Sequence, residues 1–171
     1  AKEGLALVNG TQVMTALGLL TLLRAERLCK VADIVGACTL DALKGTLSAF
    51  DRDIQRVRPF PGSLAVSRNF QKLEKHSEIA KSHQFCSKIQ DAYSLRCIPQ
   101  VHGAVRDALA FVRKILEIEV NSATDNPLVF AGRKKIINCG NFHGEPVAFA
   151  LDLLGIVISE LGGISERRIE K

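Results

Sequence analysis

The segment from Gln12 to Cys29 would carry apolar side chains on nearly every side if it formed a helix. Thr11 precedes it as a plausible N-cap. Apolar residues then point in every direction, at Val13, Met14, Ala16, Leu17, Leu19, Leu20, Leu22 and Leu23. A helix without a polar face is stable in water only when other parts of a protein surround it. The sequence therefore predicts a bundle of helices with this segment inside it.

The next part of the chain predicts further helices and a charged connection. A second helix is expected from about Val31 to Phe50, weakened by two glycines unless close packing explains them. Residues 51–62 contain two prolines and a glycine near their end and cannot be regular helix throughout. A short polar helix is expected from Ser63 to His76, and residues 77–88 form either a loop or a weak helix.

The C-terminal part of the chain predicts two more helices and one β-hairpin. Residues 99–120 show apolar side chains at steps of three and four, which is typical of an amphipathic helix. A turn ends this helix, and a small hairpin follows with strands at residues 128–130 and 135–138. Another helix starts near Glu145 and Pro146 and is expected to stop at Gly162-Gly163, so that residues 165–168 begin a further helix. The predicted fold class is mainly all-α, a single segment over residues 1–171 with no second domain.

Composition narrows the classes of function. The 171 residues are 47% hydrophobic and 24% charged, as in a folded, soluble protein. The net charge of +5 is spread along the chain and aromatic residues make up only 5%, so we expect no nucleic-acid partner. The longest apolar stretch, Val13 to Leu23, has eleven residues and is too short to span a bilayer, so we expect no membrane partner.

The cysteines and histidines do not predict a metal site. Five cysteines are scattered along the chain, and two of them precede a histidine at Cys97-x4-His102 and Cys139-x3-His143. These spacings match no common zinc pattern, and no CxxC occurs. Scattered free thiols are typical of a reducing environment, so we expect a cytoplasmic protein.

The stretch from Gln90 to Gly103, reading QDAYSLRCIPQVHG, holds an unusual set of polar side chains. In a helix, Tyr93 and Arg96 are three residues apart and share a face with Gln90. Pro99 would end that helix and open the next one. A helix break beside a tyrosine–arginine pair is a suitable place to bind a small anion. The alternative is structural: a core tyrosine, and an arginine in a weak surface ion pair.

Two loops also stand out as candidate binding segments. Asn9-Gly10-Thr11 lies at the start of the first long helix, and Asn141 to Glu145 lies at the start of the last one. Each has a structural alternative, because Asn9 is also a common turn residue and His143 could cap the helix that follows it.

Taken in order, five segments resemble the central part of the aromatic amino acid ammonia-lyases. They read KEGLALVNGT, QDAYSLRCIPQVHG, NSATDNPLVF, GNFHGEPVAFALD and SERRI, and they are spread over nearly the whole chain. The forms QDAYSLRC and GNFHGEPVA are most similar to the histidine ammonia-lyases of that family. The resemblance implies a central long-helix bundle of the ammonia-lyase/fumarase-like type.

The resemblance also implies a chemistry and roles for individual residues. The reaction would remove ammonia from L-histidine to give urocanate, using the electrophile MIO (4-methylidene-imidazole-5-one), which the family forms from an internal Ala-Ser-Gly. Asn9 would steady this group by hydrogen bonding, Phe142 would pack beside it, and Tyr93 would take part in the proton and ammonia steps. Arg96 would pair with the substrate carboxylate, with Gln90 supporting that end of the site. Independently, removing a weakly acidic β-proton needs an electrophile, a base and fixed charges around the acid group.

The sequence departs from the family pattern in three respects. It contains no Ala-Ser-Gly, which lies upstream of the KEGL segment in the family. The resemblance also implies a base tyrosine further upstream and a pocket glutamate downstream, and neither has a match in this sequence. The chain is therefore interpreted as a central part of a larger subunit, inactive by itself. The resemblance implies a homotetramer in which subunits share each active site. The alternatives are a tyrosine or phenylalanine ammonia-lyase, an aminomutase of the same family, and a non-catalytic helical scaffold that serves oligomerisation.

Overall fold

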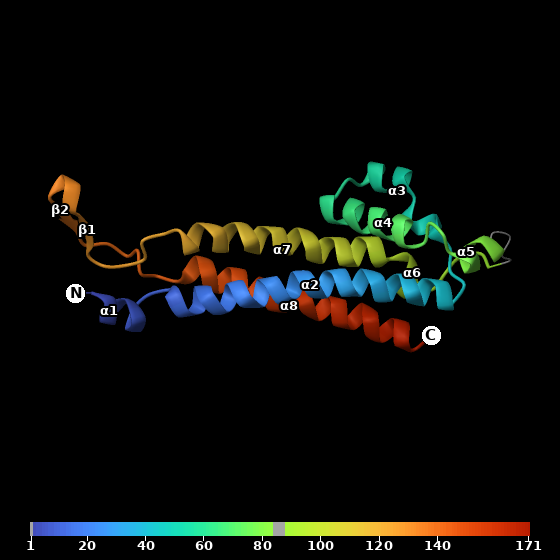
Figure 1. Ribbon diagram of the computed structural model, residues 1–171, viewed down its shortest axis with the longest axis horizontal. Coiled ribbons are helices and arrows are strands. Elements are labelled where there is room, and N and C mark those ends of the chain that lie inside the picture. Colours follow the sequence, from blue (N-terminus) through green and yellow to red (C-terminus); the bar gives the residue numbers. More distant parts are fainter. Residues whose placement is uncertain (1, 84–87) are drawn as a thin grey trace.

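A computed structural model describes residues 2–83 and 88–171 of the chain (Figure 1). Cys86 and part of the segment predicted as a loop or weak helix lie outside the described residues. The described part contains eight α-helices, two short 3-10 helices and two strands: α1 (Glu3–Val8), α2 (Gln12–Ala42), η1 (Leu47–Phe50), α3 (Arg52–Val57), α4 (Pro61–Leu73), α5 (Glu78–Ser82), α6 (Tyr93–Arg96), α7 (Ile98–Val120), β1 (Leu128–Phe130), η2 (Ala131–Arg133), β2 (Lys135–Ile137) and α8 (Glu145–Ile169).

Three long helices, α2, α7 and α8, run side by side and form the body of the molecule (Figure 1). Their facing sides bury a continuous apolar core in which Leu22, Val112, Leu116, Val147 and Leu154 are almost inaccessible to solvent. Burial of each such side chain contributes about 1.5–3 kcal/mol. The mainly α-helical bundle predicted from the sequence is confirmed.

A second core lies at one end of the bundle, under α4 and η1. Phe50 and Phe70 stack there with ring centroids 4.2 Å apart. Helix α4 lies close against α7 because glycines occupy both sides of the contact. A Cβ atom added to Gly62 would come within 2.0 Å of the Gly103 carbonyl oxygen, which only a glycine avoids.

The predicted hairpin is present at the opposite end of the bundle (Figure 1). Strands β1 and β2 pair antiparallel, with Leu128 opposite Ile137 and Phe130 opposite Lys135. The turn between them includes Lys134 in the left-handed region, with φ of 47°.

Three helix boundaries predicted from the sequence were wrong. The segments expected as separate helices around Cys29 and Val31 form the single helix α2, which ends at Ala42 rather than at Phe50. Gly36 does not break it, because this glycine packs against the ring of Phe70. Helix α4 starts earlier than expected, at Pro61, and α3 fills part of the charged connection before it. Tertiary packing overrides local helix propensity at these positions.

Helix α8 also continues where the sequence predicted a stop. It passes through Gly162-Gly163 and includes the residues expected to begin a further helix. Leu161 and Ile164, on either side of these glycines, are buried and hold this part of α8 on its neighbours. By length and composition alone, α8 is the one helix among the described residues that could cross a membrane. A helix packed between others in a large bundle has the same composition.

One face of α2 remains uncovered in a single chain. Val13, Leu17, Leu20, Val31 and Ile34 are each 50–60% exposed. The expectation that this helix is surrounded on all sides is therefore met only in part by α7 and α8. Contiguous exposed apolar surface of this kind is typical of a contact surface with further protein.

Stability is expected to decrease between about pH 4.5 and pH 7 because of Glu74. Burial raises the pKa of this carboxyl group to about 7, and the neighbouring Asp41 carboxylate adds to the effect. The folded state thus keeps a proton that the unfolded state loses near pH 4.5, so its advantage declines as the pH rises through this window. In thermal unfolding from pH 5 to 8, Glu74→Gln should lessen the fall in Tm by a few degrees. A shift of this size corresponds to ~1 kcal/mol in the free energy of unfolding. An unchanged pH profile in this variant would contradict the assignment.

Candidate active site

Tyr93 and Arg96 lie together on the short helix α6, as the sequence predicted. The Arg96 guanidinium carbon is 5.9 Å from the centroid of the Tyr93 ring. Tyr93 is 69% exposed and Arg96 is exposed as well. Both functional groups therefore face outward and are open to a ligand. A guanidinium whose planar fork is accessible can bind a carboxylate through two parallel hydrogen bonds.

Side chains that the sequence reasoning did not select fix the position of α6. Asp91 accepts hydrogen bonds from the backbone nitrogen of Thr46, at 2.7 Å, and from its hydroxyl, at 3.2 Å. Ser94 donates from Oγ to the backbone carbonyl of Arg167 on α8, at 3.3 Å. The buried side chain of Leu95 completes the attachment. Asp91 and Ser94 bond to groups 45 and 73 residues away in the sequence, so no local signal could have selected them.

Gln90 does not join the helical face predicted for it. It precedes α6 in an exposed segment without regular secondary structure, because the helix begins only at Tyr93. The Asp91–Thr46 contact holds the backbone next to Gln90 against the connection between α2 and η1. Gln90 therefore remains near the Tyr93–Arg96 pair in sequence but does not share a helical face with it.

Asn9 and Phe142 belong to loops that meet at the other end of the bundle. Gly144 lies against the start of α2, since a Cβ atom added to it would be 2.7 Å from the Met14 sulfur and 3.4 Å from Thr11. This contact brings the loop that carries Phe142 next to the turn that carries Asn9. Asn9 is exposed and Phe142 is half-buried.

Hydrogen bonds and an ion pair stabilise these loops. The Asn141 amide donates to the Ala123 carbonyl at 2.8 Å. Lys2 forms an ion pair with Asp125 at 2.6 Å, and its hydrogen bond holds the pKa of the Asp125 carboxyl below the usual range. His143 accepts a hydrogen bond at Nδ1 from the backbone nitrogen of Glu145, at 3.2 Å, and thereby caps α8. The structural alternative considered for His143 is the one observed.

The predicted residues form two groups at opposite ends of the helix bundle (Figure 1). Tyr93 and Arg96 lie at the α6 end, whereas Asn9 and Phe142 lie near the hairpin. At 1.5 Å per residue, the 23 residues of α7 alone span ~35 Å. One copy of this chain therefore does not bring the two groups into one site.

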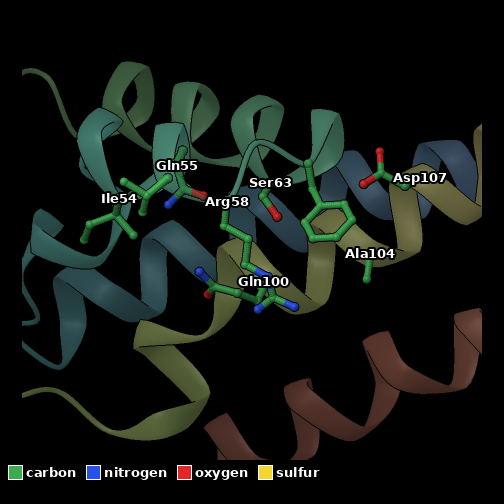
Figure 2. A pocket seen from close by; sticks show the side chains of 9 residues that line it. Ile54, Gln55, Arg58, Ser63, Gln100, Ala104 and Asp107 are labelled. Atoms are coloured by element: carbon green, nitrogen blue, oxygen red, sulfur yellow. The ribbon is translucent and has the colours of Figure 1, made fainter.

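Two hollows are relevant to the α6 end. Tyr93 lines a groove of about 590 Å³ between α6, α7 and the last turns of α8, together with Ser94, Glu160 and Arg167. A second cavity of about 480 Å³ lies between α3, α4 and α7, where Arg58, Gln100 and Asp107 reach it (Figure 2). None of the predicted site residues lines this second cavity, and Tyr93 alone among them lines the groove, so the groove beside Tyr93 is the candidate site.

The long bundle, its terminal hairpin and the loops at its ends define the long-helix bundle of the ammonia-lyase type. The sequence matches the aromatic amino acid lyase family over residues 1–171. The chain belongs to this family, which confirms the family suggested by its motifs.

Individual relatives are similar over nearly all of the chain. It is 55% identical to the histidine ammonia-lyase of Koribacter versatilis, with 100% of this chain and 36% of that protein covered. It is 58% identical to the histidine ammonia-lyase of Mus musculus over 99% of this chain and 26% of that protein. The chain thus spans about a third or less of the length of these relatives.

Solved structures are also similar over nearly all of the chain. The histidine ammonia-lyase of Trypanosoma cruzi is similar with a TM-score of 0.85 and 48% identity, over 99% of this chain and 31% of that one. The tyrosine aminomutase of Streptomyces globisporus is similar with a TM-score of 0.87 and 41% identity, over 99% of this chain and 36% of that one.

Proposed function

We propose that this chain is the central part of a lyase that eliminates ammonia from L-histidine to give urocanate. One observation carries the proposal: the exposed tyrosine–arginine pair on α6 occurs in a chain 55–58% identical to histidine ammonia-lyases. Identity to the tyrosine aminomutase structure is lower, at 41%. The histidine reaction is therefore favoured over the aminomutase alternative.

Each site residue has a role that its position supports. Arg96 binds the substrate carboxylate, because its guanidinium is exposed and donates in a planar fork. Tyr93 is the acid or base nearest to that carboxylate, since the two side chains are in contact. Gln90, exposed at the start of this segment, supports the carboxylate end of the site.

The family's electrophile, MIO, fits the residues at the other end of the bundle. When present, MIO activates the amino acid toward loss of ammonia. The exposed side-chain amide of Asn9 makes no hydrogen bond to another described residue and is thus available to a polar group of this kind. Phe142 is half-buried and offers an apolar wall beside it. The Ala-Ser-Gly from which MIO forms would come from outside this sequence.

Further copies of the chain would complete the site. The uncovered apolar face of α2 and the ~35 Å between the two groups of site residues both favour a shared site in a homotetramer. A cytoplasmic location is proposed along with this assembly, because the chain carries unpaired thiols.

Arg96→Lys in the complete protein should raise KM for histidine about 10-fold with a smaller effect on kcat. The lysine keeps the charge but loses the second, parallel hydrogen bond to the carboxylate. Arg58→Lys is a matched control, because Arg58 also lies over a ring, with its guanidinium carbon 5.3 Å from the Phe60 centroid. Steady-state kinetics should show an effect only at Arg96, and an unchanged KM would remove Arg96 from the carboxylate site.

The proposed reaction is tested with the complete protein and three amino acids. Urocanate should appear by absorbance with histidine, whereas tyrosine and phenylalanine should give little product. An intact mass two waters below the gene-encoded value would indicate that the electrophile has formed. A β-amino acid as product would indicate an aminomutase instead. Absence of any product together with an unmodified mass would favour the scaffold alternative.

A further inference from the structure

A cluster of buried polar side chains joins four helices close to α6. Asp33 of α2 is at its centre, and we define the Asp33 cluster as Asp33, Asn69, His102, Arg106 and Arg168. Asp33, His102 and Arg168 are each at most 4% exposed. The Asp33 carboxylate lies 2.9 Å from His102 Nδ1, 2.8 Å from the Asn69 amide nitrogen and 2.5 Å from the Arg106 guanidinium. Burial alone would raise the pKa of Asp33, but these neighbours outweigh it and keep the pKa below the usual range.

The hydrogen bonds of His102 have a fixed direction. Its Nε2 atom lies 3.3 Å from Nη1 of Arg168, and a guanidinium can only donate. Nε2 must therefore accept, so the ring proton is on Nδ1 and is donated to Asp33. The His102 imidazole on α7 thus joins Asp33 on α2 to Arg168 in the last turns of α8 through two hydrogen bonds of defined direction.

The buried charge of Arg168 has a cost in folding free energy, because its guanidinium is removed from water. Its guanidinium reaches His102 and the Ser165 hydroxyl, and no carboxylate among the described residues is within ion-pair distance of it. Burial accordingly lowers its pKa, and the Asp33 charge offsets this only in part. An apolar side chain of similar volume often replaces such a buried charge without loss of stability. A contribution to stability is therefore a poor explanation for an arginine at this position.

The Asp33 cluster is connected directly to α6. The backbone carbonyl of Arg167, next to Arg168, accepts the hydrogen bond from the Ser94 hydroxyl on α6. His102 lies one turn after the start of α7, and only Cys97 separates α6 from α7. The same part of α8 is thus fixed to α7 through the Arg168 side chain and holds α6 through the Arg167 backbone.

From this geometry we propose that His102 and Arg168 are positioning residues that hold Tyr93 and Arg96 in the orientation needed for catalysis. The proposal rests on the ammonia-lyase function proposed above. Both side chains are buried, His102 at 1% and Arg168 at 4% exposed, and neither lines the groove beside Tyr93, so both act through α6 rather than on the substrate. A misplacement of reacting groups by about 1 Å can reduce the rate about 100-fold.

The proposal is tested with Arg168→Met in the complete protein. We expect kcat to fall about 10- to 100-fold while Tm is unchanged or higher, because a buried charge is removed and the alignment is lost. Hydrogen exchange of a peptide covering residues 92–98 should become faster. Arg168→Lys replaces this variant if Arg168→Met does not fold, and His102→Gln should show the same exchange effect. Arg113→Met is the control, since it also removes a guanidinium from the bundle, but Arg113 pairs with Glu26 and Glu117 and lies ~16 Å beyond His102 along α7.

The outcomes separate the two proposals. A kcat within twofold of wild type and unchanged exchange over residues 92–98 in folded variants would overturn the positioning role. A fall in Tm that accounts for the lost activity would do the same. A wild-type protein without activity on histidine would instead overturn the proposed function. The exchange measurement does not depend on activity and would still decide whether the Asp33 cluster holds α6.

Discussion

Tyr93→Phe in the complete protein should lower kcat on histidine by ~100- to 1,000-fold, within the range usual for loss of an acid–base group. The variant keeps the ring that contacts Arg96, so carboxylate binding and KM should change little. The fold should be unaffected, because the side chain is 69% exposed. Its hydroxyl also makes no hydrogen bond to another described residue.

Steady-state kinetics and thermal unfolding together check this expectation. Ser82→Ala is a suitable control, because it also removes an exposed hydroxyl near the same end of the bundle without altering α6. Its kcat should stay within twofold of wild type. A Tyr93→Phe enzyme with near wild-type turnover would show that the proton and ammonia steps use another group.

The sequence was sufficient to predict the helical bundle and the hairpin. Long helices with apolar faces have a periodic sequence pattern, as between Pro99 and Val120. This pattern can be recognised without knowing which elements the helix packs against. The Tyr93–Arg96 pair could also be predicted, since two residues three apart in a helix are neighbours on its surface. The roles of these residues came from the family motifs rather than from the pattern.

Features that depend on distant contacts were not predictable in this way. Gly36 and Gly162 suggested weak or broken helices, but packing of α2 and α8 on their neighbours keeps both helices continuous. His102 stood out as part of a polar stretch, yet its partners Asp33 and Arg168 are 69 and 66 residues away in the sequence. Local patterns carry no information on such pairings.

The distance between the two groups of site residues has a consequence for assembly. Asn9 and Phe142 lie at one end of a rigid helix bundle, and Tyr93 and Arg96 lie at the other (Figure 1). No movement of a loop closes a separation of ~35 Å along α7. A site that uses both groups must therefore combine different copies of the chain.

Mixing two inactive variants should accordingly restore activity. Asn9→Ala and Tyr93→Phe subunits, each nearly inactive alone, should regain about one quarter of wild-type turnover when co-assembled in equal amounts, because a quarter of randomly formed shared sites contain both intact residues. Wild-type subunits co-assembled with the double variant provide the control. Shared sites should again give about one quarter, whereas sites within one chain would give about one half. Absence of recovery in the first mixture, together with one half in the second, would show that one chain supplies both residues.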